Sequence, residues 1–494
     1  MVMPHTRVLV AGGGPAGSLT AAMLAREGMA VTLVEKEEFP RYHIGESLLT
    51  SALPTLGFVG AAERVAAHGF VRKYGGYFRM KQGEVPGHID FTTQGKYRHS
   101  YQVVRSEFDN ILFDHARSVG ANVNDRTAVT DVDFDEGRPV AATLRQPDGS
   151  TGRISFDYLV DATGQSGLLS ARYFKDRRAE ETFANVAVGT YFRGAKVYRD
   201  IHGAERPGAF SMEALTDGSG WTWAIPLHGD RLSVGVVVHR DVFRARRYDL
   251  GSDEAVFADG LSRSPDVTSL LEYAERDGQV RVWRDYSYFA ANYAGPGYRL
   301  VGDAAGFIDP LFSTGVHMAC MGALSAAATI CSEIRCDHSA EALERFHHGY
   351  LAQAYTRLII TVAGFYRQLR NQDEIVLPGV SSEDFQRAFD LIQPVVSGDM
   401  DLDSDEVSAD EVDRAMRYTA DMMREAHGLS TNNRVAKFMT TMDDERLAGR
   451  LAAVDGMYIR MVRGRLGVAR LGAVESALSA LRRRVIRRLV STKR

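Results

Sequence analysis

The N-terminal sequence Arg7-Val-Leu-Val-Ala-Gly-Gly-Gly-Pro-Ala-Gly17 is an apolar run that enters a glycine-rich turn. Residues 18–27 follow with helical composition, Gly28 ends the helix, and residues 30–34 form a second apolar run. The order of strand, glycine turn, helix and strand is that of a dinucleotide-binding βαβ unit. The sequence therefore predicts an α/β fold that opens on a nucleotide site.

Each glycine of this turn has its own task in such a unit. Gly12 permits the tight turn, Gly14 lets the backbone approach a pyrophosphate, and Gly17 lets the helix pack on the strand. Glu35 ends the second strand 18 residues after Gly17, where a carboxylate can bind ribose hydroxyls. A fortuitous glycine turn is the alternative. The predicted nucleotide contacts are Gly12, Gly13, Gly14, Ala16, Gly17 and Glu35.

Composition limits what the whole chain can be. It has 494 residues, 45% of them apolar and 25% charged, which is enough for two or three folded domains. The net charge of −4 argues against a general nucleic-acid binder. The three cysteines show neither a disulfide pattern nor metal-ligand spacing, so we expect no metal and a reducing, cytoplasmic location. Residues 1–5 lead straight into the first predicted strand, so we expect no signal peptide.

The uncharged stretch from Pro310 to Ser332 has the length of a membrane span. Its small residues and His317 favour a closely packed internal helix instead, so we expect no transmembrane segment. Strands are predicted at 75–80, 102–105, 158–160 and 232–238, and helices at 341–368 and 383–392. The predicted domains are 1–335, with a substrate-side sheet from about 70–105 and 175–290, and a mainly helical 336–494.

Two runs of charge mark the C-terminal part. Residues 399–413 hold eight acidic residues and no basic one, whereas residues 446–494 carry a net charge of +11. Residues 478–489 predict an amphipathic helix whose polar face holds Arg483, Arg484, Arg487 and Arg488. This helix is either a solvated helix packed on its own domain or a docking surface for an acidic partner or an anionic membrane.

Two later elements identify the nucleotide. Tyr298-Arg-Leu-Val-Gly-Asp-Ala-Ala-Gly306 ends a strand in Gly-Asp, so that Asp303 can reach a ribityl hydroxyl. Asp161-Ala-Thr-Gly164 closes another strand in the same manner, and no second G-x-G-x-x-G provides a resident nicotinamide site. Together these elements resemble the FAD-binding fold shared by aromatic hydroxylases and flavin halogenases. FAD is the expected cofactor.

Three further segments resemble FAD-dependent halogenases, which halogenate electron-rich aromatics in natural-product biosynthesis. They are Phe39-Pro-Arg-Tyr-His-Ile-Gly-Glu-Ser-Leu48, Gly220-Trp-Thr-Trp-Ala-Ile-Pro226 and Asp309-Pro-Leu-Phe-Ser-Thr-Gly-Val316. With the glycine turn, the resemblance extends from the N-terminus to about residue 330. It adds four residues to the expected cofactor contacts: Arg41, Glu46, Arg105 and Val316.

The resemblance also implies a halide site and a shield. Thr314 and Gly315 match the positions that bind chloride, at a helix N-terminus whose free N–H groups suit an anion. Ordinary helix capping by a hydroxyl is the alternative. Trp221 and Trp223 are two apart in a predicted strand and so face one side. In the family this element is thought to keep organic substrate away from the flavin, and a heavy aromatic core strand is the alternative.

Lys73 matches the segment in which the family carries its active-site lysine. There it would hydrogen-bond hypochlorous acid or form a haloamine; from the residues alone, a surface lysine is the alternative. Tryptophan halogenases place a glutamate at the position of Phe312. Because a free indole needs that carboxylate and a phenol or pyrrole does not, Phe312 favours a phenolic or pyrrolic substrate.

The implied reaction uses FADH2 from a separate flavin reductase, dioxygen and chloride, and chlorinates the ring through hypochlorous acid. An FAD-dependent aromatic hydroxylase of the same fold is the first alternative. A non-catalytic flavoprotein or carrier-protein adaptor is the second. The residues leave open which aromatic is the substrate, whether it is free or tethered to a carrier protein, how many halogens are added and where, and the oligomeric state.

Overall fold

The computed structural model describes residues 3–93, 97–284, 286–372, 377, 386–398, 411, 414–415, 418 and 453–472. The acidic run at 399–413, apart from Glu411, lies outside these residues, as does the helix predicted at 478–489.

The nucleotide-binding half is built on an eight-stranded sheet. Five consecutive neighbours in it, β19-β10-β1-β2-β7, run parallel, with β1 at the centre between β10 and β2. Its central residues Val8, Leu9 and Val10 are fully buried, as an apolar strand between two neighbours requires. The strands are β1 (His5–Ala11), β2 (Val31–Val34), β7 (Asn122–Asn124), β8 (Ala128–Asp135), β9 (Arg138–Arg145), β10 (Thr151–Asp161), β18 (Ala294–Gly295) and β19 (Tyr298–Leu300).

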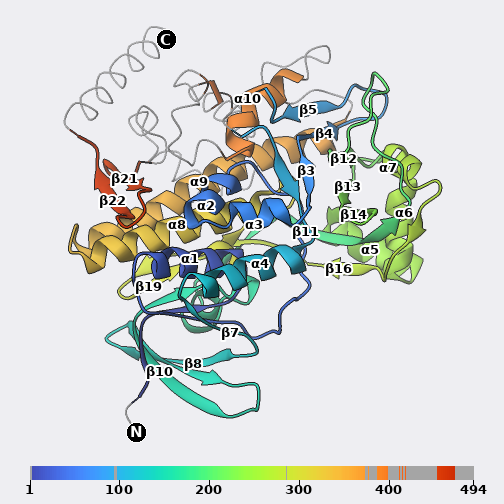
Figure 1. Cartoon of the computed structure of the whole chain (residues 1–494). Helices are drawn as coiled ribbons and strands as arrows, with labels where there is room; N and C mark the ends of the chain where they lie inside the picture. Colours follow the sequence, from blue (N-terminus) through green and yellow to red (C-terminus); the bar gives the residue numbers. More distant parts are fainter. Residues whose placement is uncertain are drawn as a thin grey trace.

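Helices cover this sheet. Figure 1 shows α1 and α4 side by side above the strands, and α8 and α9 crossing the middle of the molecule behind them. These helices are α1 (Pro15–Arg26), α4 (Arg105–Ser118), α8 (Thr314–Ile334) and α9 (Ala340–Arg370), and the short helices α2 (Ala52–Val59) and α3 (Ala62–Ala67) lie beside them. The predicted strand at 102–105 is wrong beyond Gln102, because α4 begins at Arg105.

The second sheet has ten strands in the order β20-β17-β11-β14-β13-β12-β4-β5, with β15 and β16 also on β11. Helices α5 (Arg240–Leu250), α6 (Asp253–Ser262) and α7 (Pro265–Leu270) pack on one side of it (Figure 1). The strands are β4 (Gly75–Arg79), β5 (Gly87–Asp90), β11 (Arg178–Arg193), β12 (Phe210–Ala214), β13 (Gly220–Leu227), β14 (Arg231–His239), β15 (Glu275–Arg276), β16 (Arg281–Trp283), β17 (Tyr286–Phe289) and β20 (Gly306–Phe307). Strands β3 (Val71–Lys73) and β6 (Ser100–Gln102) form a separate two-stranded sheet.

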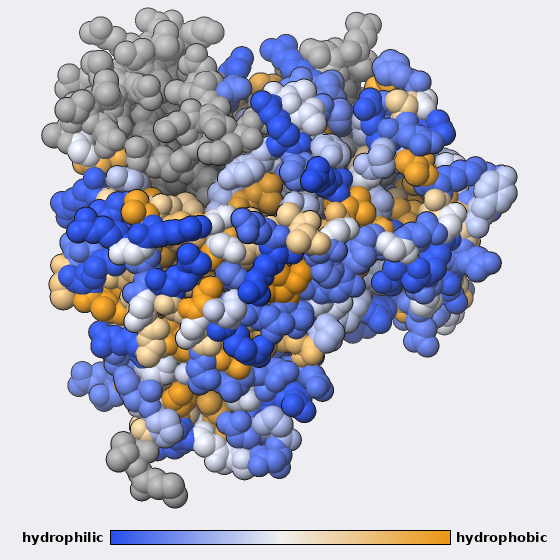
Figure 2. Space-filling model, viewed as in Figure 1, coloured by the Kyte–Doolittle hydropathy of each residue, from blue (hydrophilic) through white to orange (hydrophobic). Residues whose placement is uncertain are grey.

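The uncharged stretch is an internal helix. Among the described residues, α8 is the one helix long and apolar enough to cross a membrane, and 94% of its most apolar window is buried inside the protein. It packs against α1 on one side and α9 on another, which explains its many small residues. On the face shown in Figure 2, the surface of the described residues is mostly polar, with apolar residues scattered over it.

The described C-terminal residues contain a β-hairpin that the sequence did not predict. Its strands, β21 (Met457–Arg460) and β22 (Gly467–Arg470), pair antiparallel. Glu27 at the end of α1 accepts hydrogen bonds from the backbone of Gly464 and Leu466, and Arg335 after α8 donates to Leu466. The helix α10 (Gln386–Val396) lies near the second sheet, against β5. The proposed boundary between residues 335 and 336 stays a prediction.

Candidate active site

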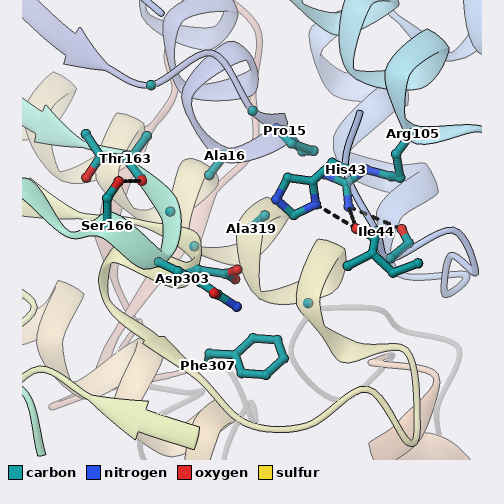
Figure 3. Close-up of a pocket in the computed structure, with 18 of the residues that line it drawn as sticks. Pro15, Ala16, His43, Ile44, Arg105, Thr163, Ser166, Asp303, Phe307 and Ala319 are labelled. Carbon is teal, nitrogen blue, oxygen red and sulfur yellow. Dashed lines mark hydrogen bonds between the residues drawn. The ribbon is translucent and has the colours of Figure 1, made fainter. Parts of the chain in front are cut away.

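A cavity of about 900 Å³ lies between the two sheets, and both the predicted nucleotide contacts and the predicted halide residues line it. This volume is at the upper end of the roughly 300–1,000 Å³ typical of small-molecule sites. Figure 3 shows residues from the start of α1, the segment around His43, the start of α4, the segment after β10, and the segments before and within α8 arranged around one space. The predicted residues that line it are Gly12, Gly14, Ala16, Glu35, Arg41, Glu46, Arg105, Trp221, Trp223, Asp303, Thr314, Gly315 and Val316.

The glycine turn fits a pyrophosphate. Gly12 has φ +109°, and a Cβ there would lie 2.1 Å from the carbonyl oxygen of Ala162. Gly17 is needed for packing, because its Cβ would lie 1.8 Å from the oxygen of Gly12. At Gly14 a Cβ would meet only the Arg41 guanidinium, at 3.3 Å, and no side chain caps the start of α1. The amides of the first helical turn therefore remain available to an anion in the cavity.

Glu35 is held in place by backbone amides. Its two carboxylate oxygens accept from Gly13 N at 2.8 Å and Glu37 N at 3.0 Å. Gly13 and Gly17 do not line the cavity; Gly13 acts through Glu35, which does. A buried carboxylate fixed at the end of β2 is suited to the hydroxyls of a ribose.

A buried ion pair fixes the opposite wall. Arg105 donates to both oxygens of Asp109, at 2.8 and 3.0 Å, and to the carbonyls of Ile44 and Gly45, at 2.7 and 3.2 Å. Burial alone would raise the pKa of Asp109, but Arg105 outweighs it and the net pKa is lowered. His43 faces the same space (Figure 3), and burial together with Arg105 lowers its pKa to about 4. The wall therefore offers a guanidinium whose charge is paired with Asp109, and a neutral imidazole.

Glu46 is the second acid of this wall. It is buried, and burial raises the pKa of its carboxyl group. The hydroxyl of Tyr191, on β11, donates to its Oε1 at 2.6 Å. Glu46 thus links the cofactor half to the second sheet.

The two predicted tryptophans face one side of β13, as their spacing requires. Their ring centroids are 6.2 Å apart, and both line the cavity. Trp223 pairs with Gly235 of β14, where a Cβ would lie 2.1 Å from its ring, so that glycine makes the slot for the indole. Trp221 Nε1 donates to Tyr366 at 2.8 Å.

A buried network holds the turn before α8. Asp309 Oδ1 accepts from Leu311 N at 2.9 Å, while its Oδ2 accepts from Asn185 Nδ2 at 2.8 Å and from the Tyr366 hydroxyl at 2.9 Å. Asn185 also donates to Tyr366, at 2.9 Å. Neither Asn185 nor Tyr366 was predicted as a site residue, and no local pattern marks them, because they meet Asp309 from β11 and α9.

The start of α8 is open to the cavity. Ser313 has φ +61° and makes no capping hydrogen bond through its side chain, so the capping alternative is not what the structure shows at this residue. A Cβ on Gly315 would meet nothing within 4 Å. Thr314 is buried and lines the cavity. The first amides of a 21-residue helix therefore point toward free space that suits an anion.

Lys73 lies in a second, smaller chamber. It is 4% exposed, whereas its neighbour Arg72 is exposed, so the surface-lysine alternative is wrong. The ammonium lies 5.4 Å from the ring of Phe91 and 5.7 Å from that of Phe210. Burial lowers the pKa of Lys73 to about 7. An amine with this pKa is present at neutral pH in both its charged and its neutral form.

The chamber is apolar and shares a wall with the cofactor cavity. Its volume is about 20 Å³, room for one water molecule. Phe210 and Ser313 line both cavities. Phe312 lines the chamber and packs against Phe78, with 5.5 Å between ring centroids. Among the residues that the structure describes, no acidic one lines it.

The cavity fits FAD: the glycine turn suits its pyrophosphate, Glu35 suits its ribose, and Trp221 and Trp223 offer aromatic surface to its flavin ring. Comparison with known proteins agrees. A family model described as an FAD binding domain matches residues 5–356. The chain is thus an FAD-binding protein of the aromatic-hydroxylase type, as expected. The flavin-dependent halogenase armH4 of Armillaria mellea is 43% identical over 444 residues, covering 85% of this chain and 83% of that protein.

Two more relatives agree. The sulochrin halogenase gedL of Aspergillus terreus is 42% identical over 428 residues, covering 82% of this chain and 78% of that protein. The structure of the myxobacterial chondrochloren halogenase CndH matches with a TM-score of 0.69 and 29% identity, covering 82% of this chain and 99% of that one. The chain belongs to the family of flavin-dependent halogenases. It is an enzyme, and the halogenase interpretation is favoured over the hydroxylase and adaptor alternatives.

Proposed function

We propose that the protein chlorinates a phenolic or pyrrolic ring in natural-product biosynthesis, with Lys73 as the catalytic residue. The observation that carries this proposal is the position of Lys73, buried in an apolar chamber that meets the cofactor cavity at Phe210 and Ser313. When bound, reduced FAD together with dioxygen supplies the oxidising power that turns chloride into hypochlorous acid.

The protein's own residues then have distinct tasks. The glycine turn, Glu35, Arg105 and Asp303 bind and orient FAD. The amides at Thr314 and Gly315 hold chloride at the end of the cavity that borders the Lys73 chamber. The two tryptophans exclude organic substrate from that end.

Lys73 acts in the chamber. In its charged form it donates a hydrogen bond to hypochlorous acid, which makes the chlorine more electrophilic. In its neutral form it accepts the proton of a phenol and so activates the ring. The net step replaces a ring hydrogen by chlorine and releases water.

The chamber also favours one class of substrate. Phe312 occupies the position at which tryptophan halogenases carry a glutamate, so this position supplies no carboxylate to stabilise a cation on an indole ring. A substrate must activate its own ring through an oxygen or a nitrogen. Since the chamber holds about 20 Å³, a ring enters only when its walls separate, and Val396 at the end of α10 is one of them.

Partners and location complete the proposal. Reduced flavin comes from a separate reductase, and the enzyme works in the cytoplasm on an aromatic that is free or tethered to a carrier protein. Docking of a carrier protein by Arg483, Arg484, Arg487 and Arg488 stays a prediction, as these residues lie outside the described part of the chain.

The test is mass spectrometry of phenols and pyrroles incubated with the enzyme, a flavin reductase, and chloride or bromide. We expect mass shifts of the added halogen with wild type and none with Lys73→Met. Hydroxylated products that do not depend on halide would overturn the proposal. Rapid NADPH consumption without a reductase would contradict the two-component arrangement.

A further inference from the structure

Three potential metal ligands meet outside the site described above. They come from three elements: His68 from the C-terminal end of α3, Glu107 from the first turn of α4, and His228 from the turn between β13 and β14. The Nε2 atoms of the two histidines lie 2.6 and 2.9 Å from the same oxygen, Oε2 of Glu107. All three ligand atoms lie within 4.8 Å of one another.

The two imidazoles are already oriented toward a common point. The Phe70 ring packs against both, with centroids 4.4 Å from His68 and 5.5 Å from His228, and the two imidazoles meet edge to face at 5.7 Å. The three side chains are 33%, 38% and 29% exposed, so they are accessible to an ion and only partly free to move. Little ordering is therefore left for a ligand to impose.

We propose that His68, Glu107 and His228 form a binding site for a divalent transition cation of the zinc class. Two neutral imidazoles and one carboxylate are a ligand set that zinc accepts, with water in the fourth position. Tetrahedral ligands at 2.0–2.1 Å from zinc lie about 3.4 Å apart. Binding therefore needs the Glu107 oxygen to move about 0.5 Å further from His228 and about 0.8 Å further from His68, and both Nε2 protons to leave.

The surroundings set the strength of this site. In the described part of the chain, Nδ1 of His228 is buried without a hydrogen-bond partner. Metal-bound histidines normally donate from the other nitrogen to an acceptor, which raises affinity. We therefore expect exchangeable binding rather than the tight hold of a structural zinc.

The position of the site gives the cation a consequence. His68 is five residues before Lys73, Glu107 is two after Arg105, and His228 is five after Trp223. A cation that joins the three ligands ties together α4, which holds Arg105, and the segments that directly precede β3 and follow β13. Bound metal should stabilise the fold. No local sequence motif marks the site, because no two of its ligands are near in the chain.

The experiment is a zinc titration of the full-length protein, treated with chelator and then freed of it, in the FAD-loaded form. We expect one zinc per chain by calorimetry and a rise in melting temperature. His228→Gln and Glu107→Gln should each lower the zinc affinity at least tenfold, and His202→Gln, an exposed histidine elsewhere, should leave it unchanged.

A second readout keeps the proposal independent of folding defects in the variants. Cobalt(II) bound to wild type without flavin should give the visible absorption of a tetrahedral site, and zinc should displace it. Absence of saturable binding to wild type would overturn the proposal. So would equal affinity in folded His228→Gln and wild type, since the three side chains would then be only a hydrogen-bonded cluster.

Discussion

Replacing Lys73 by methionine should make the protein more stable while it abolishes halogenation. Burial lowers the pKa of this amine from 10.5 to about 7. In the unfolded chain the amine keeps its ordinary pKa, so between about pH 7 and 10.5 the unfolded state binds more protons than the native state. Stability from this group therefore rises with pH across that window, and the full penalty is present below it.

The magnitude follows from the two pKa values. Their difference, 10.5 − 7 = 3.5, corresponds to about 5 kcal/mol below pH 6.5, about 3 kcal/mol at pH 8 and about 1 kcal/mol at pH 10. Methionine has a similar shape and no charge, so Lys73→Met should recover most of this free energy. These figures are upper values, because the chamber can admit one water molecule.

The assay is urea unfolding of wild type and Lys73→Met at pH 6.5, 8 and 10, with chlorination measured on the same preparations. Lys175→Met, at an exposed lysine, is the control and should change neither stability nor activity. Equal stability of wild type and Lys73→Met at pH 6.5 would refute the burial of an uncompensated amine. A stability gap that does not shrink toward pH 10 would refute its titration.

Three more changes test the cofactor and halide sites. Tyr366→Phe should lower the free energy of unfolding by about 1–3 kcal/mol and raise the KM for chloride, because it leaves Trp221 Nε1 unpaired and loosens the turn before α8. Thermal melting and halide kinetics measure the two effects, with Tyr350→Phe on the same helix as the control. Gly315→Ala should stabilise α8 by up to about 1 kcal/mol and yet raise the KM for chloride, since the new methyl group enters open space at the halide position. Arg105→Lys should weaken FAD binding at least tenfold by fluorescence titration, because a lysine cannot hold Asp109 and two carbonyls at once.

The parts of the site that lie close together in sequence could be predicted from it. Gly12 has a positive φ, and a Cβ there would lie 2.1 Å from a carbonyl oxygen. Because only glycine satisfies both constraints, this turn can be recognised in the sequence. Glu35 follows from the position of β2, and the shared face of Trp221 and Trp223 from strand geometry. Lys73 could be placed only through family resemblance, because a short strand does not reveal what covers it.

Contacts between distant segments could not be predicted. Tyr366 reaches Asp309 from 57 residues away and Trp221 from 145, and nothing in the α9 sequence distinguishes this tyrosine from a core residue. The hairpin at residues 457–470 lies in the part of the chain, 336–494, that was predicted to be mainly helical. Its four-residue strands are too short to show a clear period-2 pattern.

The wall shared by the cofactor cavity and the Lys73 chamber affects whether the substrate is halogenated or hydroxylated. A species that passes from the halide position to Lys73 must cross at Phe210 and Ser313, which line both spaces. A small hypohalous acid needs a narrower opening in this wall than an aromatic ring does, so the wall can pass the one and hold back the other. Ser313 lies in the turn that Asp309 fixes through Asn185 and Tyr366. The buried network therefore acts on selectivity as well as on halide binding: a loosened turn should let substrate approach the flavin, and hydroxylated by-products of Tyr366→Phe would reveal it.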